Sequence, residues 1–323
     1  MTADVDGLRS AVEQSLRRHS PTPWLPDPAN TTVTLLVDGI YHANFLVYSG
    51  GQVHVARVSR RSQWGLSTIA QLQREFAVLV DLAPLDVAPR PLALVDSPGA
   101  VPMIVESFLG GDFLPYPAGL SHCAETLATV HQCVPRRSGP LLDSRPAKEF
   151  LLGEAEKLLD STVPDTSATR VLRRCAGVLE QRGLPETVPV LLHTDLIQHN
   201  IVLAADRCRF LDWEGARRGS AAWDLAYLLS PITLRWADSW GIEEFGDEQS
   251  VIRAYSSHAG LDAATLTDHV AAFMPFVVLR AAAWCVRRSV SLTRSGDAVT
   301  DRLALFSSPE FLLAHFRDLG VSV

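Results

Sequence analysis

The sequence predicts an α+β fold in which a small, β-rich N-terminal domain precedes a larger domain made mainly of helices. Short runs that alternate apolar and polar residues, as strands do, concentrate before residue 109. From Leu120 onward, the apolar residues recur mostly at helical spacing. The change falls at "LGGDFLPYP", a stretch of glycine and proline that breaks both patterns. We therefore expect two domains, residues 1–109 and 110–323.

The elements of the N-terminal domain are separated by glycine and proline. Residues 6–18 have helical spacing, and the prolines of "SPTPWLPDP" end that helix. Two alternating runs within residues 33–58 meet at Gly50-Gly51, which predicts a β-hairpin. Residues 67–82 return to helical spacing, and residues 87–108 predict two strands joined by a Ser-Pro-Gly turn.

The C-terminal domain is predicted to be helical with one β insert. Helices are expected at about residues 120–133, 146–160 and 166–182, followed by short strands within residues 190–213 and further helices to the end. The most apolar helix, residues 270–286, contains Pro275 and Arg280. It is too short and too interrupted for a membrane span, so we expect a buried core helix.

Composition narrows the class of protein. The 323 residues include 29 Lys+Arg and 36 Asp+Glu, a formal charge of −7 without any basic block, so no nucleic-acid partner is expected. The five cysteines form no C-x-x-C pair, which predicts reduced thiols in a cytoplasmic protein. The acidic N-terminus "MTADVDGL" is unlike a signal peptide, and we expect no membrane partner. A monomer and a homodimer both stay open.

The stretch "PVLLHTDLIQHNIVL" carries the main chemical signal. Asp195 and Asn200 lie on a loop between two apolar strands, and Asp212 follows the next strand, "CRFL". A hairpin-like arrangement of the strands would bring these three side chains together at the ends of the strands. Carboxylate and amide oxygens suit Mg²⁺ bound together with substrate phosphates. A second carboxylate that is free of metal can accept a hydroxyl proton, so the set predicts phosphoryl transfer.

The sequence resembles the aminoglycoside phosphotransferases and their choline-kinase-like relatives, which are small-molecule kinases with a bilobal protein-kinase-like fold. The resemblance extends from about residue 33 to residue 229. It rests on "LLHTDLIQHNIVL" and "RCRFLDWEGARRGSAAWDLAYLL", which match the family's H-x-D-x-x-x-x-N, D-W-E and D-L-A motifs. The resemblance implies a small, β-rich N-terminal lobe that binds nucleotide and a helical C-terminal lobe that binds the acceptor.

The resemblance assigns roles position by position in the C-terminal half. Asp195 would be the catalytic base, and Asn200 and Asp212 would be the magnesium ligands. His193 would be a structural member of the catalytic loop. Asp224, in "WDLA", would brace that loop.

Upstream matches imply a nucleotide site for ATP or GTP. In "VHVARVS", Arg57 stands where the family grips phosphate, and in "QREFAVLVDL", Glu75 would pair with that cation. The stretch "VPMIVESFLGG", with Glu106 and Phe108, matches the hinge that presents backbone groups to adenine. Taken alone, the first pair could equally be a solvated strand residue and a surface helix charge.

The loop expected to cover the phosphates is "VDGIYHANF", with Gly39 and Asn44 as its candidate contacts. Its single glycine departs from the glycine-rich loop of protein kinases, which leaves the choice between ATP and GTP open. Two further departures from the family are Thr194, where glycine or asparagine is usual, and Arg57, which stands in place of lysine, although arginine is common among relatives there. Arginine can hold two phosphate oxygens, so it is compatible with activity.

The acceptor is expected to be a small molecule with a hydroxyl group. Ten residues separate Asp212 from Trp223, which is too short for the peptide platform of a protein kinase. Residues 237–250 are rich in acidic and aromatic side chains and could bind a cationic or sugar-like ligand, or be a solvated loop before a helix. The candidate acceptor contacts are Glu214, Trp240, Glu243 and Glu244.

Three functions stay open at this level. The first is a Mg²⁺-dependent phosphotransferase acting on an antibiotic (aminoglycoside, macrolide, peptide or nucleoside) or on a metabolite such as choline, a sugar or an amino alcohol. The second is a catalytically silent kinase-like domain that binds nucleotide, against which the intact Asp195, Asn200 and Asp212 argue. The third is a metal-dependent hydrolase that uses His193 and Asp195 as ligands.

Overall fold

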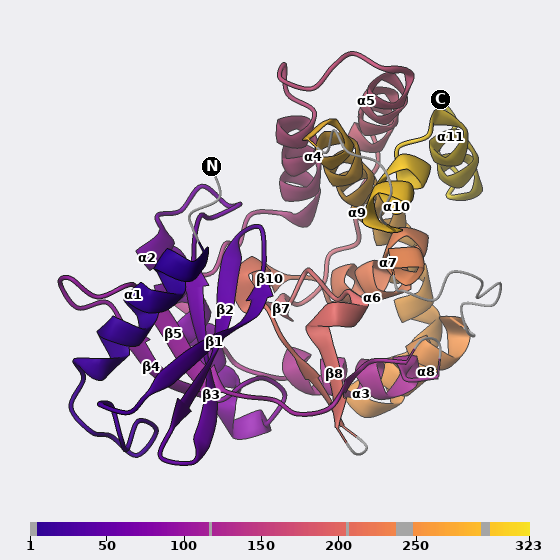
Figure 1. Cartoon of the computed structure of the whole chain (residues 1–323). Coiled ribbons are helices and arrows are strands. Elements are labelled where there is room, and N and C mark those ends of the chain that lie inside the picture. The colour runs from indigo at the N-terminus through magenta and orange to yellow at the C-terminus, as the bar shows by residue number, and fades with distance from the viewer. Residues whose placement is uncertain (1–4, 116–117, 205–206, 237–247, 292–297) are drawn as a thin grey trace. The chain divides into compact units, whose positions relative to one another are not determined.

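The computed structural model describes residues 5–115, 118–204, 207–236, 248–291 and 298–323 (Figure 1). The chain forms two compact units, each of them assembled from three segments. The first unit comprises Met1–Asp112, Cys133–Leu142 and Val202–Ala216, and the second comprises Phe113–Gln132, Asp143–Ile201 and Arg217–Val323. The first unit therefore includes two segments that lie beyond residue 109 in the sequence. The predicted α+β fold is confirmed.

The first unit is built on a five-stranded antiparallel sheet in the order β1-β2-β3-β5-β4. Its strands are β1 (Thr32–Asp38), β2 (His42–Ser49), β3 (Gln52–Ser59), β4 (Pro91–Val95) and β5 (Met103–Ser107). The predicted hairpin is confirmed, because β2 pairs with β3 through a two-residue turn. Both turn residues have positive φ, 55° at Gly50 and 79° at Gly51, as a type I′ turn requires.

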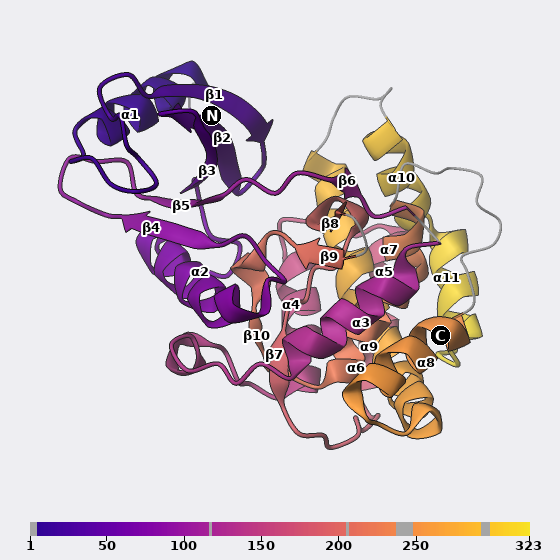
Figure 2. The same ribbon diagram turned by 90° about the horizontal axis from the view of Figure 1, so that it is seen from below.

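Helices α1 and α2 pack on different sides of this sheet. Helix α1 (Val5–Arg17) buries Val12 and Leu16 in a core with Phe45, Val47 and Ala56. Helix α2 (Thr68–Leu82) packs against β3, β4 and β5 and continues into the short helix η1 (Ala83–Leu85). Figure 2 shows α1 and α2 on different sides of the strands. Because side chains alternate along a strand, β3 directs Ala56 to the core with α1 and Arg57 to the other face.

The β insert forms two small sheets instead of one hairpin. Strand β7 (Val190–Leu192) pairs antiparallel with β10 (Arg217–Gly219). Strands β6 (Asp112–Phe113), β8 (Ile201–Ala204) and β9 (Arg207–Phe210) form the other sheet in the order β6-β8-β9. Of the strands predicted here, only β8 and β9 are hairpin neighbours, while the strands on either side of the Asp195 loop belong to different sheets.

The second unit is helical around α9. Its described helices are α3 (Leu120–His131), α4 (Ala147–Leu158), α5 (Ser167–Glu180), α6 (Ala221–Leu229), α7 (Pro231–Trp236), α8 (Glu248–Ala259), α9 (Ala263–Ser291), α10 (Ala298–Phe306) and α11 (Pro309–Asp318). Helix α9 contacts α4, α5, α6, α8 and α10, so it forms the centre of this unit. The short helices η2 (Gly139–Leu141), η3 (Gln198–Asn200) and η4 (Trp213–Gly215) lie in the connections of the chain.

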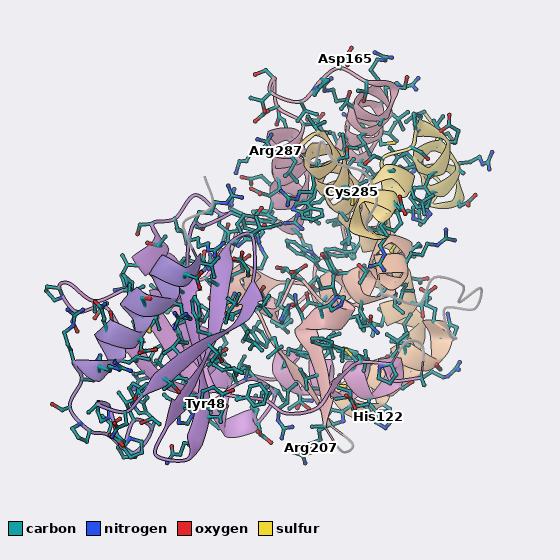
Figure 3. The ribbon with its side chains drawn as sticks, viewed as in Figure 1. Tyr48, His122, Asp165, Arg207, Cys285 and Arg287 are labelled. Atoms are coloured by element: carbon teal, nitrogen blue, oxygen red, sulfur yellow. The ribbon has the colours of Figure 1, made fainter. Side chains whose placement is uncertain are left out.

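Helix α9 is long and apolar enough, by length and composition, to cross a membrane. However, 72% of its most apolar window is buried inside the protein, which is typical of a core helix. It also continues through Pro275. The five cysteines are free thiols and four of them are buried, including Cys285 on α9 (Figure 3). Burial raises the pKa of the Cys285 thiol to about 12, so this thiol is unreactive.

Candidate active site

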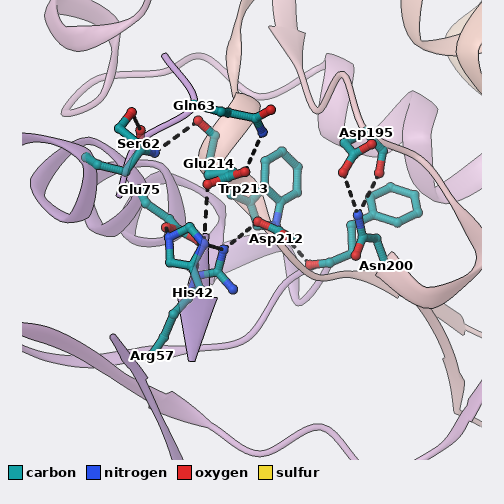
Figure 4. A network of polar contacts seen from close by, with 12 residues as sticks. His42, Arg57, Ser62, Gln63, Glu75, Asp195, Asn200, Asp212, Trp213 and Glu214 are labelled. Carbon is teal, nitrogen blue, oxygen red and sulfur yellow. Dashed lines mark hydrogen bonds and ion pairs between the residues drawn. The ribbon is translucent and has the colours of Figure 1, made fainter. Parts of the chain in front are cut away.

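A buried ion pair between Arg57 and Glu75 forms the centre of the polar cluster in the first unit. Nε of Arg57, on β3, lies 2.7 Å from Oε1 of Glu75, on α2. The two residues are 5% and 1% exposed, so neither is a solvated surface charge. Nη2 of Arg57 also contacts Oδ1 of Asp212, whose carboxylate is partly exposed. Arg57 thus joins the strand, the helix and the segment after β9 (Figure 4).

Acidic groups outnumber basic groups in this cluster, because several carboxylates surround one buried guanidinium. Burial acts to lower the pKa of Arg57, but Asp212, Glu75 and Glu214 outweigh it and raise that pKa, so Arg57 stays protonated. Burial raises the pKa of Glu75, and Arg57 opposes the rise. Burial also raises the pKa of Glu106 to about 8, so this carboxyl holds a proton near neutral pH.

Asp212 is directed into the cluster by an uncommon backbone conformation. Its φ of 65° and ψ of 66° lie in the left-handed region, which few residues other than glycine adopt. The following helix η4 is fixed to α2, because Gln71 Nε2 donates to the carbonyl oxygen of Glu214 at 3.1 Å and Arg74 donates to the same oxygen. Such uncommon conformations persist where the surroundings hold them, and they are frequent at functional sites.

His42 is a member of this cluster that sequence reasoning missed. Nη2 of Arg57 donates to Nδ1 of His42 at 3.1 Å, and the same Nδ1 lies 3.3 Å from Oε2 of Glu214. Burial and the nearby Arg57 lower the pKa of His42 to about 3, so the imidazole is neutral. The alternation of side chains along β2 is the signal that could have revealed His42. Asn44 of β2 pairs with Arg57 of β3, so Asn44 and His42, two residues away, lie on the same face of the sheet as Arg57.

Glu214 was predicted to contact the acceptor, and the structure places it in the polar cluster. It is 4% exposed, and Gln63 Nε2 donates to its Oε1 at 2.5 Å. The potential ligand atoms of His42, Asp212 and Glu214 all lie within 4.8 Å of one another. A role for Glu214 in acceptor binding stays a prediction. Trp240, Glu243 and Glu244 lie outside the described residues.

The other predicted nucleotide contacts also lie in the first unit. Gly39 lies between β1 and β2, where a Cβ atom would come within 2.7 Å of the carbonyl oxygen of His42. A side chain would therefore not fit at Gly39 without movement of the backbone. Glu106 is buried on β5, and Phe108, just after β5, is 44% exposed. Their roles in nucleotide binding stay predictions.

The carboxylate of Asp195 is held on both of its oxygens within the second unit. Nδ2 of Asn200 donates to Oδ2 at 3.0 Å and also to the backbone oxygen of Asp195 at 2.9 Å. The hydroxyl of Tyr227, on α6, donates to Oδ1 at 2.7 Å. Asp195 follows β7, and the chain then turns into η3, so that Asn200 comes back to the carboxylate (Figure 4).

Asp224 fixes the backbone of the same loop. Its fully buried carboxylate accepts hydrogen bonds from the backbone N–H groups of His193 and Thr194, both at 2.7 Å. Nε2 of His131, at the end of α3, lies 3.2 Å from the same carboxylate, and its Nδ1 lies 2.7 Å from the hydroxyl of Tyr255 on α8. These contacts connect the loop to three helices.

The backbone of Thr194 has a conformation that glycine or asparagine adopts more readily than threonine. Its φ is 69°, a left-handed conformation that is unfavourable for a β-branched residue. The two hydrogen bonds to Asp224 hold this turn in place. The polar contacts of the predicted residues thus form one cluster in each unit, around Arg57 in the first and around Asp195 in the second.

The fold and these clusters define a small-molecule phosphotransferase with a protein-kinase-like fold. The family model described as the phosphotransferase enzyme family matches residues 32–261, well over half of the chain. The protein therefore belongs to this family, and the predicted resemblance is confirmed. A comparison with curated proteins finds no match.

Solved structures of small-molecule kinases are similar to this chain in fold. A choline kinase from Cryptosporidium parvum is 15% identical with a TM-score of 0.66, and 98% of each chain is covered. An ethanolamine kinase from Plasmodium vivax is 17% identical with a TM-score of 0.63 over 90% of this chain and 85% of that one. An amicoumacin kinase in complex with AMP-PNP and Ca²⁺ is 15% identical with a TM-score of 0.64 over 94% of each chain.

Proposed function

We propose that this protein transfers the γ-phosphate of ATP or GTP, with Mg²⁺, to a hydroxyl group of a small molecule. The observation that carries the proposal is the geometry of Asp195, a partly exposed carboxylate fixed by Asn200 and Tyr227 on a loop that Asp224 anchors. A general base must be held in one orientation to remove a proton from a bound hydroxyl. Asp195 is held in this way.

The proposed step moves one proton and one phosphoryl group. The acceptor O–H gives its proton to the carboxylate of Asp195 as its oxygen forms a bond to the γ-phosphorus. The bond between that phosphorus and the β–γ bridging oxygen breaks, and the nucleoside diphosphate leaves with the electron pair. Arg57, which stays protonated, would bind phosphate oxygens while Glu75 holds its guanidinium. Exchange of Asp212 for phosphate would keep the charge of Arg57 balanced.

Two side chains fit the magnesium role. The carboxylate of Asp212 is partly exposed, and the left-handed backbone directs it into a cluster of oxygen ligands. Asn200 uses its Nδ2 toward Asp195, and no hydrogen bond to its Oδ1 is found among the described residues. Carboxylate and amide oxygens are the ligands that Mg²⁺ prefers. When bound, Mg²⁺ would neutralise charge on the phosphate oxygens.

The acceptor we propose is an antibiotic, so that phosphorylation of its hydroxyl confers resistance. The amicoumacin kinase neighbour supports this choice. The choline kinase and ethanolamine kinase neighbours favour a second candidate, an amino alcohol of metabolism. The free thiols fit action in the reducing cytoplasm.

A phosphate-transfer screen tests the proposal. The protein is incubated with MgATP or MgGTP and one acceptor at a time: aminoglycosides, macrolides, peptide and nucleoside antibiotics, choline, ethanolamine and sugars. Mass spectrometry should show one acceptor that gains a phosphoryl group. The Asp195→Asn variant should bind nucleotide normally and lose about 10²- to 10⁴-fold in kcat. Nucleotide binding without transfer to any acceptor or to water would instead indicate a silent kinase-like domain.

A further inference from the structure

The hydroxyl of the buried Tyr227 side chain forms a hydrogen bond with Asp195, the proposed base. Tyr227 is 7% exposed, and its hydroxyl lies 2.7 Å from Oδ1 of Asp195. A buried tyrosine hydroxyl usually finds a partner somewhere, so burial alone says nothing about function. Its partner here, however, is a partly exposed carboxylate that must point toward a bound acceptor. The hydroxyl is thus placed to control the direction of that carboxylate.

Helix α6 brings two different restraints to one loop. Asp224 and Tyr227 are three residues apart, and residues at this spacing lie on the same face of a helix. Asp224 binds the backbone N–H groups of His193 and Thr194, which sets the path of the loop. Tyr227 binds the side chain of Asp195 directly. The backbone restraint leaves rotation of the Asp195 side chain open, and the hydroxyl of Tyr227 limits it.

The proton of the Tyr227 hydroxyl stays in place. Burial, and then the charge of Asp195, raise the pKa of this phenol well above its usual value. The hydroxyl therefore acts as a donor, and an O–H donor facing a carboxylate makes a strong, charge-assisted hydrogen bond. Asn200 donates to the other oxygen at 3.0 Å. A carboxylate oxygen has two lone pairs, so an oxygen that accepts one hydrogen bond can still take up the acceptor proton.

We infer that Tyr227 is a positioning residue that holds the carboxylate of Asp195 in the orientation needed for proton removal. This inference rests on the proposed function of Asp195. Without the hydroxyl, the carboxylate loses the restraint on Oδ1 and turns away from the productive direction. Tyr227→Phe keeps the ring and its packing, so it removes this restraint with little other change. A misplacement of about 1 Å can cost about 10²-fold in rate.

A double-mutant cycle on nucleotide hydrolysis tests the inference. With MgATP and water as the acceptor, Tyr227→Phe should lower kcat about 10- to 100-fold and leave the KM for MgATP unchanged. In the Asp195→Ala background, the same substitution should have no further effect, because the side chain on which it acts is gone. An equal fall in both backgrounds, or no fall in either, would overturn the inference.

Tyr255→Phe is the matched control. It removes another buried tyrosine hydroxyl from the same unit, one that lies 2.7 Å from Nδ1 of His131 and is connected to the loop backbone through His131 and Asp224. The fold-change in kcat that Tyr255→Phe causes should be the same in the wild-type background and in the Asp195→Ala background. A cycle with Tyr255 that is as strongly coupled as the cycle with Tyr227 would show a general effect on the unit and would overturn the inference.

A second measurement separates failure of the inference from failure of the proposed function. If the folded wild-type protein neither binds nor hydrolyses MgATP or MgGTP, the proposed function is wrong. Crystal structures of wild type and Tyr227→Phe then decide the positioning role. A single Asp195 orientation in wild type and a turned or split one in the variant support it, and an unchanged carboxylate overturns it.

Discussion

The guanidinium of Arg57 forms an ion pair with the carboxylate of Asp212, which follows it by 155 residues in the chain. The same guanidinium binds Glu75. Two of the groups that the phosphoryl-transfer hypothesis needs, the phosphate-gripping cation and a metal ligand, therefore neutralise each other's charge. In the proposed reaction, phosphate oxygens and Mg²⁺ would replace this contact.

Arg57→Ala should raise the KM for nucleotide and lower kcat, because phosphate loses its buried cation. A double-mutant cycle with Glu75→Ala, followed by urea unfolding, should show a coupling of about 1–3 kcal/mol. The comparison pair is Arg209 and Asp86, an exposed ion pair of the same unit at 2.6 Å. That pair should be coupled by less than about 1 kcal/mol. Equal coupling energies in both cycles would contradict a special stabilising role for the buried ion pair between Arg57 and Glu75.

Asp212→Ala should abolish the Mg²⁺ dependence of nucleotide binding, because a charged ligand is lost. Asn200→Ala should weaken that dependence less, since only a neutral oxygen is removed. Titration calorimetry with ATP, with and without Mg²⁺, measures both effects. Similar, mild effects of the two substitutions would contradict Asp212 as the principal metal ligand.

Thr194→Gly should stabilise the protein by about 1 kcal/mol. A non-glycine residue in the left-handed region costs about 1–2 kcal/mol, and part of the gain is returned because glycine is more flexible in the unfolded state. The control is Thr129→Gly in helix α3, which should destabilise the protein, because glycine is a poorer helix former than threonine. The free energy of unfolding from urea curves decides the sign at each position. A destabilised Thr194→Gly variant would mean that side-chain contacts of Thr194 outweigh the backbone strain.

The stability of the protein should fall between about pH 4.5 and pH 8 through Glu106. Burial raises the folded-state pKa of Glu106 to about 8 from 4.5, so the folded state binds the proton more tightly than the unfolded state does. This contribution is complete below pH 4.5 and is lost as the pH rises to 8. Each pH unit in this window costs at most about 1.4 kcal/mol.

Glu106→Gln should flatten that pH dependence, because glutamine stays neutral in both states. Glu125→Gln, on the exposed side of α3, controls for the loss of one carboxylate. Urea unfolding at several pH values gives the slopes of the three proteins. If the wild-type and Glu106→Gln slopes are the same, Glu106 does not hold a proton in the folded state.

Local patterns predicted much of the fold because they report on local physics. The alternation in β2 and β3, with Gly50 and Gly51 between them, indicated the hairpin, and helical spacing indicated α1 and α2. Motif spacing also indicated Asp195 and Asn200, which are close in sequence and lie together on one loop. These features depend on neighbours within a few residues.

The parts that the sequence did not predict depend on distant packing. Tyr227 lies 32 residues from Asp195, and its helical pattern looks like that of any buried aromatic residue. His42 meets Glu214 only because η4 is fixed to α2. Likewise, no periodicity could show that β7 pairs with β10 and not with β8. Each of these contacts depends on how elements dock, and docking leaves no local signature.

The first unit is assembled from three separate segments of the chain, and these segments leave the ribosome at different times. Its sheet is complete in sequence by Ser107, but its last segment ends at Ala216. At about 5–20 residues per second, that segment emerges several seconds after the sheet. During this delay, the buried charge of Arg57 must be balanced without Asp212. Until then, Arg57 and His42 lack their contacts with Asp212 and Glu214, and an expressed fragment that stops at Asp112 would lack them as well.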